Sequence, residues 1–127
     1  MEKIKNKEIY KFLIVGSSSV LLDFIIYRIL VSSGLDVSSS KLLSFVSGSV
    51  FGFILNKYWT FNSKKKAFKE IIYYIVLYTI TAYLNIEVNK FVLGLYTNTL
   101  FSFLCATGVS TVINFLGQKF IVFKKNT

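Results

Sequence analysis

Two amide–lysine pairs recur 62 positions apart in this chain, and they are the residues best suited to bind an anion. Asn56-Lys57 and Gln118-Lys119 each follow an apolar segment. A lysine ammonium offers phosphate a compact positive charge with three donors, and a side-chain amide adds donors and an acceptor. Two such pairs at equivalent depths near one membrane face would suit an anionic headgroup. The alternative is that both lysines are ordinary interfacial anchors.

Further polar residues lie inside apolar segments, where they are costly unless they face the bundle interior or a partner. Asp23 lies about 16 Å along a helix from Phe12, near mid-membrane. It therefore needs a partner or a role, and the structural alternative is a neutral, hydrogen-bonded Asp that ties helices together. The same shift places Asp23 on Asn85 and Arg28 on Lys90. We predict that these groups line a path for an anionic headgroup. The predicted binding residues are Lys57, Lys119, Asn56, Asn114, Gln118, Asp23, Asn85, Arg28 and Lys90.

The composition excludes several functional classes. With 127 residues, 54% of them hydrophobic, a mean hydropathy of +0.58 and a net charge of +9, the chain is too apolar for a soluble nucleic-acid binder. Four spans of about 20 residues each would leave no room for a soluble catalytic domain. The absence of His and the single cysteine, Cys105, remove the usual general base, the commonest metal ligand and disulfides. We therefore expect no enzyme activity, cofactor or metal site.

Four apolar segments are expected to form transmembrane helices, at about residues 12–31, 41–55, 71–93 and 99–116. A stripe of small residues recurs every four positions in the second, so that it lies on one narrow helix face: Ser44, Gly48, Gly52 and Asn56. Small residues let a neighbouring helix approach closely in lipid. In the third segment, Glu87 and Lys90 are three residues apart and could pair on one face.

The two halves of the chain are similar without a gap. The shift of 62 positions places Ser44 on Ala106 and Gly48 on Ser110 as well as matching the polar residues above. Apolar matches carry little weight, but small and polar matches at intramembrane positions indicate an internal duplication. The predicted repeats cover about residues 10–61 and 72–123 of a single integral membrane domain, 1–127.

The lysines predict the orientation. Of thirteen span-flanking lysines, twelve lie in the N-terminus, the segment 57–70 and the tail, whereas Lys41 alone lies in the two remaining turns. The positive-inside rule then places both termini and the basic loop, about residues 62–70, in the cytoplasm. The fold class is therefore an all-α membrane protein with four transmembrane helices arranged as two parallel helix-hairpin repeats.

Several short motifs resemble the GtrA-like family of small four-span bacterial membrane proteins. They are K-F-L-I-V-G at 11–16, Leu22-Asp23, and F-I-L-N-K-Y-W-T-F at 53–61 with its echo at 115–123. The resemblance covers about residues 8–124. Two departures are Gly52, where the family often has a second Asn, and Gly117-Gln118-Lys119, where Asn and a basic residue would follow Asn114. We therefore expect the halves to share one polar set, with Asn56 from one and Asn114 from the other, rather than to form two equivalent sites.

The resemblance implies a role in glycosylating a cell-surface polymer such as teichoic acid or O-antigen. In that role the protein flips a polyprenyl-phosphate-linked monosaccharide, such as an undecaprenyl phosphate sugar, from the inner to the outer leaflet of the bacterial plasma membrane. Its expected partners are that lipid, membrane lipids, glycosyltransferases acting before and after it, and in one option a second copy of itself, but no nucleic acid.

Two other functions fit parts of the sequence. A non-transporting accessory subunit of a membrane glycosyltransferase would use the Gly48 and Gly52 face and the basic loop for docking. A small multidrug-type proton antiporter also has four short spans and a carboxylate in the first, so that Asp23 would bind cations and protons. Paired lysines favour an anionic substrate over that antiporter, because they give a cation no advantage.

Overall fold

The computed structural model describes residues 3–125, and the regular structure in that range is entirely helical. The elements are α1 (Asn6–Ser32), α2 (Val37–Leu55), η1 (Asn56–Thr60), α3 (Ala67–Tyr96), α4 (Thr99–Gly117) and η2 (Gln118–Val122). Four helices, two of them extended by η1 and η2, are long and apolar enough to cross a membrane. The all-α membrane fold with four spans is thus confirmed.

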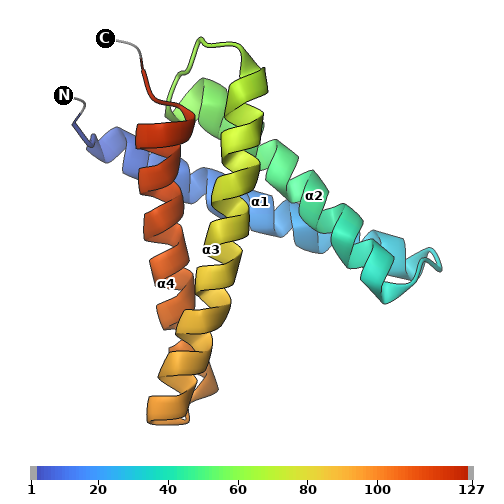
Figure 1. Ribbon diagram of the computed structural model, residues 1–127. Coiled ribbons are helices and arrows are strands. Elements are labelled where there is room, and N and C mark those ends of the chain that lie inside the picture. Colours follow the sequence, from blue (N-terminus) through green and yellow to red (C-terminus); the bar gives the residue numbers. More distant parts are fainter. Residues whose placement is uncertain (1–2, 126–127) are drawn as a thin grey trace. The chain divides into compact units, whose positions relative to one another are not determined.

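The chain divides into two compact units, with the boundary between Ser63 and Lys64. In the first unit α1 and α2 pack as an antiparallel hairpin, and in the second α3 and α4 do the same (Figure 1). The short helices η1 and η2 extend α2 and α4 and pack against α1 and α3, respectively. The boundary falls between the two repeats expected from the sequence, and the prediction that both belong to one domain stays a prediction.

The turns within the two hairpins use equivalent caps. The Asp36 side chain accepts a hydrogen bond from the Ser39 N–H at 2.9 Å, and Asn98 accepts one from the Phe101 N–H at 2.9 Å. Asp36 and Asn98 are 62 positions apart. Each side chain satisfies a backbone donor that the first helical turn leaves unpaired. The bond from the Ser39 N–H lowers the pKa of the Asp36 carboxyl, since it favours the charged form.

The helices are longer than the apolar segments predicted. The first starts at Asn6 rather than near Phe12, and the second starts at Val37 because Asp36 caps it. Helix α3 begins at Ala67, inside the predicted loop 62–70, and carries Glu70 in its first turn, where a negative charge favours a helix N-terminus. Hydropathy marks the hydrocarbon-spanning part of a helix, whereas capping and first-turn charges decide where it ends.

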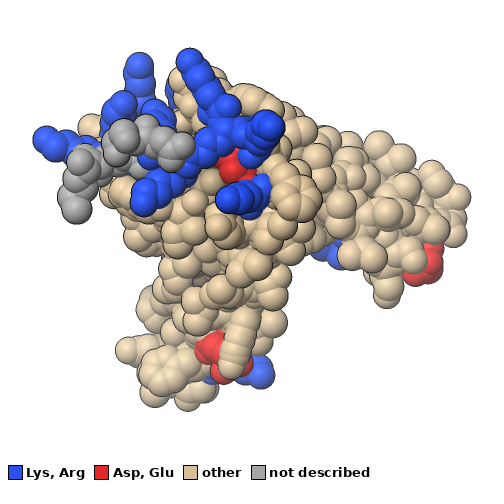
Figure 2. All heavy atoms as spheres, turned by 45° about the horizontal axis from the view of Figure 1, so that its top comes forward, with Lys and Arg blue, Asp and Glu red and all other residues tan. Residues whose placement is uncertain are grey.

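Close packing within each hairpin depends on glycine. A Cβ at Gly48 would lie 2.8 Å from the Ser19 carbonyl oxygen and 3.3 Å from the Asp23 Cβ. A Cβ at Gly117 would meet the Leu77 side chain. The predicted small-residue face of α2 therefore packs on α1, as close approach in lipid requires. In each unit, Lys and Arg gather mainly toward the end that carries η1 or η2 (Figure 2).

Candidate functional site

Each unit ends in a π-helical turn, and each turn begins at the amide of an amide–lysine pair. In η1 the Phe61 N–H donates to the Asn56 carbonyl oxygen at 2.9 Å, and in η2 the Phe123 N–H donates to that of Gln118 at 2.7 Å. The two turns are 62 positions apart. Isolated π turns are rare in proteins, and those that occur are often found at functional sites. The repeat therefore extends to an uncommon backbone conformation at the residues predicted to bind an anion.

The lysine of each π turn is buried. Lys57 is 1% exposed and Lys119 is 3% exposed. The Lys57 ammonium lies 3.4 Å from the Ser63 hydroxyl and 5.4 Å from the centroid of the Tyr58 ring. The Lys119 ammonium lies 5.6 Å from the centroid of the Phe120 ring. An interfacial anchor normally extends its charged end into water or headgroups, so this burial weakens the anchor alternative.

The amides of the π turns are buried too. Asn56 is 3% exposed, and its Oδ1 accepts a hydrogen bond from the Thr60 hydroxyl at 2.8 Å. Gln118 is fully buried at the start of η2. One turn earlier on α4, the buried Oδ1 of Asn114 has no hydrogen-bond partner among residues 3–125. An unpaired buried acceptor is costly, which suits a group that receives a donor from a substrate.

Two buried carboxylates lie at the basic ends of the units, and the sequence reasoning missed them. Glu8 is 5% exposed and Glu70 is 2% exposed, and they too are 62 positions apart. The Glu8 carboxylate accepts a hydrogen bond from the Lys5 N–H at 3.1 Å. One turn after Glu8, the Phe12 ring lies 6.3 Å from that of Phe61, which places the start of α1 beside η1. Extending the shift to residue 8 would have found both acids.

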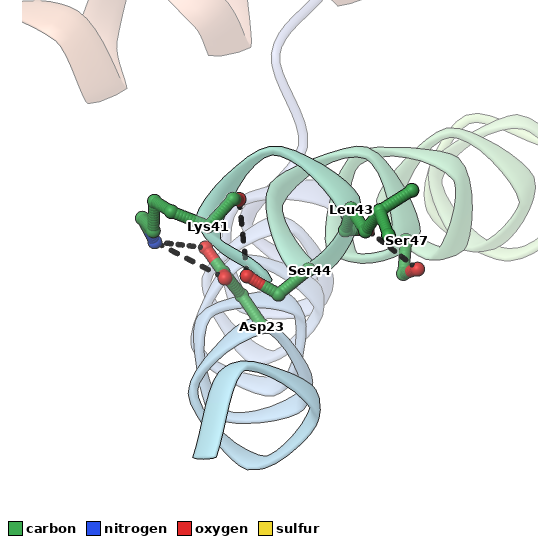
Figure 3. A network of polar contacts seen from close by, with 5 residues as sticks. All are labelled: Asp23, Lys41, Leu43, Ser44 and Ser47. Atoms are coloured by element: carbon green, nitrogen blue, oxygen red, sulfur yellow. Dashed lines mark hydrogen bonds and ion pairs between the residues drawn. The ribbon is translucent and has the colours of Figure 1, made fainter. Parts of the chain in front are cut away.

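Asp23 has a partner that the sequence analysis assigned to the outer turn. The Lys41 ammonium donates to both Asp23 carboxylate oxygens, at 3.1 and 2.9 Å (Figure 3). The Ser44 hydroxyl lies beside this pair and donates to the Lys41 carbonyl oxygen at 3.1 Å. Asp23 thus sits in an ion pair between α1 and α2. This pairing differs from the neutral tie considered as the structural alternative.

The equivalent position in the second unit holds an uncharged pair. The Asn85 amide donates to the Ser110 hydroxyl at 2.9 Å. Further along α3, the Lys90 ammonium lies 3.9 Å from the Glu87 carboxylate, so the predicted pair is confirmed. Arg28, like Lys90, is exposed on the half of its helix remote from the π turn. The nine predicted residues therefore fall into two groups in each unit, one at the π turn and one along the first helix.

A family model for the transmembrane domain of GtrA/DPMS proteins matches residues 11–123. The chain belongs to the GtrA/DPMS transmembrane-domain family. A relative from Bacillus subtilis (strain 168), described as "Uncharacterized membrane protein YngA", is 27% identical over 122 residues, which are 95% of this chain and 82% of that protein. The GtrA/DPMS match includes both π turns and all nine predicted residues, whereas Glu8 lies before it. Family and helices together make this a multi-pass membrane protein.

The geometry of this GtrA/DPMS domain suits recognition of an anion. Each unit supplies a buried ammonium and a buried amide on a π turn, at an end rich in further lysines. Electrostatic attraction is stronger where water is excluded, and an amide can orient neutral hydroxyl groups beside the charge. A site for a phosphate with an attached sugar would need both properties, a positive charge for the phosphate and an amide for the sugar hydroxyls.

Proposed function

We propose that this chain moves a polyprenyl-phosphate-linked monosaccharide from the inner to the outer leaflet of the bacterial plasma membrane. The sugar would then glycosylate a cell-surface polymer such as teichoic acid or O-antigen. The observation that supports this most is the repeated π turn, which carries a buried amide and a buried lysine in each unit of a GtrA/DPMS membrane domain. A lipid phosphate offers such a lysine negative charge and acceptor oxygens.

The predicted orientation gives the transfer a direction. With both termini cytoplasmic, the π turns lie at the inner face, where Lys57 and Lys119 meet the phosphate first. In each unit the amides beside the lysine, Asn56 in the first and Asn114 and Gln118 in the second, are the groups that bind sugar hydroxyls, while the polyprenyl tail stays in lipid. The polar groups along α1 and α3 then offer the headgroup successive partners toward the outer face. Glycosyltransferases supply the lipid-linked sugar and consume it.

Two structural observations favour this function over its alternatives. The Gly48 face of α2 is covered by α1 of the same unit, so it is not a free docking surface for a glycosyltransferase. The Asp23 carboxylate is held by Lys41, and a carboxylate already paired with an ammonium is a poor site for a cationic drug. The lysines of the π turns would also repel such a cation.

Reconstitution tests the proposal directly. The purified chain, placed in liposomes, should expose a labelled polyprenyl-phosphate sugar on the opposite leaflet, and a neutral polyprenol should gain no such transfer. A chain that binds a glycosyltransferase but moves no lipid would instead support the accessory-subunit alternative. Sugar analysis of the cell-wall polymer after deletion of the gene would identify the sugar and the acceptor.

Binding measurements test the two lysines. Each contributes a charge-assisted bond, about 1.5–3 kcal/mol, so Lys57→Ala or Lys119→Ala should weaken polyprenyl phosphate binding about tenfold or more. Lys64→Ala, in the exposed basic loop, is the matched control and should leave binding unchanged. Losses in the double variant that equal the sum of the single losses would indicate independent action, and smaller ones would indicate a shared lipid. Unchanged affinity in Lys57→Ala, Lys119→Ala and the double variant would refute the phosphate role.

A further inference from the structure

Lys41 is a charged residue of the first unit that the proposed function does not yet use. Its ammonium bonds both oxygens of Asp23, yet its side chain remains 58% exposed, against 16% for Asp23. The carboxylate is therefore enclosed between the helices, while the ammonium also faces outward from them (Figure 3). An exposed charge in a membrane-spanning hairpin is accessible to the headgroup of a lipid that passes along it.

The direction of the Lys41 side chain is unusual for a residue so close to a helix end. Lys41 lies four residues into α2, where a lysine normally extends toward the nearer headgroups. Gly48 packs against Ser19 and Asp23, so in the antiparallel hairpin Lys41 lies level with Tyr27, whose ring centroid is 5.9 Å from the ammonium. Asp23 is about one helical turn, about 5 Å, further into the hairpin. Asp23 thus draws the ammonium toward the middle of the membrane.

The second unit shows that the hairpin does not need an ion pair here. At the equivalent positions it has Asn85 for Asp23 and Phe103 for Lys41, and Asn85 bonds Ser110 instead. An uncharged hydrogen bond therefore ties α3 to α4 where an ion pair ties α1 to α2. Because charges in lipid are costly, a pair that serves only to hold two helices together would be the more expensive choice.

We propose that Lys41 is a further phosphate-binding residue for the lipid in transit, and that Asp23 is the internal carboxylate which the lipid phosphate displaces from it. The inference rests on the proposed function. A phosphodiester presents two non-bridging oxygens, as a carboxylate does, so it can replace both bonds that Asp23 now accepts. After the phosphate leaves, the carboxylate recaptures the ammonium, which resets the site.

The test is titration of polyprenyl phosphate into the full chain in phosphatidylcholine nanodiscs. Lys41→Gln should weaken binding about tenfold, the effect of losing one charge-assisted bond. Asp23→Asn should tighten it severalfold, because the competing carboxylate is gone while the ammonium remains. A purely structural ion pair predicts that neither variant changes the affinity, and that result would overturn the proposal.

Two controls separate a folding defect from a binding defect. The double variant Asp23→Asn/Lys41→Gln has an uncharged pair, as the second unit does, and should fold but bind as weakly as Lys41→Gln. If it binds as tightly as wild type, Lys41 makes no phosphate contact. Lys64 is an exposed loop lysine, so Lys64→Gln removes the same charge and should leave the affinity unchanged. An equal loss of affinity in Lys64→Gln would mean that the effect of Lys41→Gln comes from the change in net charge alone, which would overturn the proposal.

The ligand arms identify the source of the phosphate. Inorganic phosphate and neutral polyprenol should not compete with polyprenyl phosphate at Lys41. In phosphatidylglycerol nanodiscs the tenfold effect of Lys41→Gln should persist, and its disappearance would assign Lys41 to bulk headgroups and overturn the proposal. If wild type neither binds polyprenyl phosphate nor transfers its sugar in liposomes, the proposed function itself fails. If wild type binds polyprenyl phosphate and transfers its sugar, and Lys41→Gln binds with the same affinity, the proposed function stands and the role of Lys41 and Asp23 is refuted.

Discussion

Substitution of Gly48 by Ala would test the close approach of α1 and α2. The new Cβ would lie 2.8 Å from the Ser19 carbonyl oxygen, a backbone atom that cannot move without shifting α1. Overpacking of this kind costs about 1–3 kcal/mol. Alanine also raises helix propensity by up to about 1 kcal/mol over glycine, so a single measurement would mix a loss with a gain.

A matched pair removes that ambiguity. Gly16 is in α1 and has nothing within 4 Å of its would-be Cβ, so Gly16→Ala shows the propensity gain alone. The difference in unfolding free energy between Gly48→Ala and Gly16→Ala should therefore equal the overpacking cost, about 1–3 kcal/mol. Gly117→Ala should fall between them, because it meets the flexible end of the Leu77 side chain rather than backbone.

The assay is denaturant-induced unfolding of the purified chain in one detergent, followed by tertiary signals of the aromatic residues. Wild type and the three variants are compared at the same protein and detergent concentration. Gly48→Ala as stable as Gly16→Ala would refute the packing argument. It would also weaken the argument that Lys41 lies level with Tyr27, because that argument depends on the contact of Gly48 with Ser19 and Asp23.

Three further predictions concern orientation and the polar residues. A cysteine placed at Lys65 should react only with reagent on the cytoplasmic side and one at Ser38 only from outside, and the reverse pattern would overturn the predicted orientation. Asp23→Asn should insert normally, since an amide is cheaper to bury than a carboxylate, yet lose sugar transfer in cells; full activity would leave Asp23 with a structural role alone. Lys57→Arg and Lys119→Arg should retain much of the lipid-phosphate binding, because a guanidinium also binds phosphate; losses as large as those of the Ala variants would contradict a simple charge contact.

The parts of the structure that the sequence predicts are those that depend on residue type at a fixed spacing. Four apolar runs predict four spans, and the small residues around Gly48 predict the face that packs on α1. The shift of 62 positions pairs Asn56 with Gln118 and Lys57 with Lys119, and each pair has the same local structure in its unit. Periodicity reports such features because each depends on a few neighbouring side chains.

The features that sequence reasoning missed depend on geometry that spacing does not encode. The partnership of Asp23 with Lys41 follows from the register of the hairpin and from a lysine that extends away from its nearer helix end. The π turn is defined by which backbone groups are hydrogen-bonded, and the side chains of residues 56–60 do not predict it. Glu8 and Glu70 are different, because the same shift would have revealed them had it been applied before the first apolar segment.

The π turn has a consequence for comparing these helices with their relatives on a helical wheel. Because the Phe61 N–H takes the place at the Asn56 carbonyl that Thr60 would take in an α-helix, one residue is added without a change in the direction of the helix. A wheel drawn with a constant step of 100° per residue is therefore wrong from residue 57 onward, and again from residue 119. Phe61, rather than Thr60, continues the row of Ser44, Gly48 and Gly52, and an aromatic ring closes a row of small side chains. Alignments that delete or insert one residue here would place a different side chain at the end of that row.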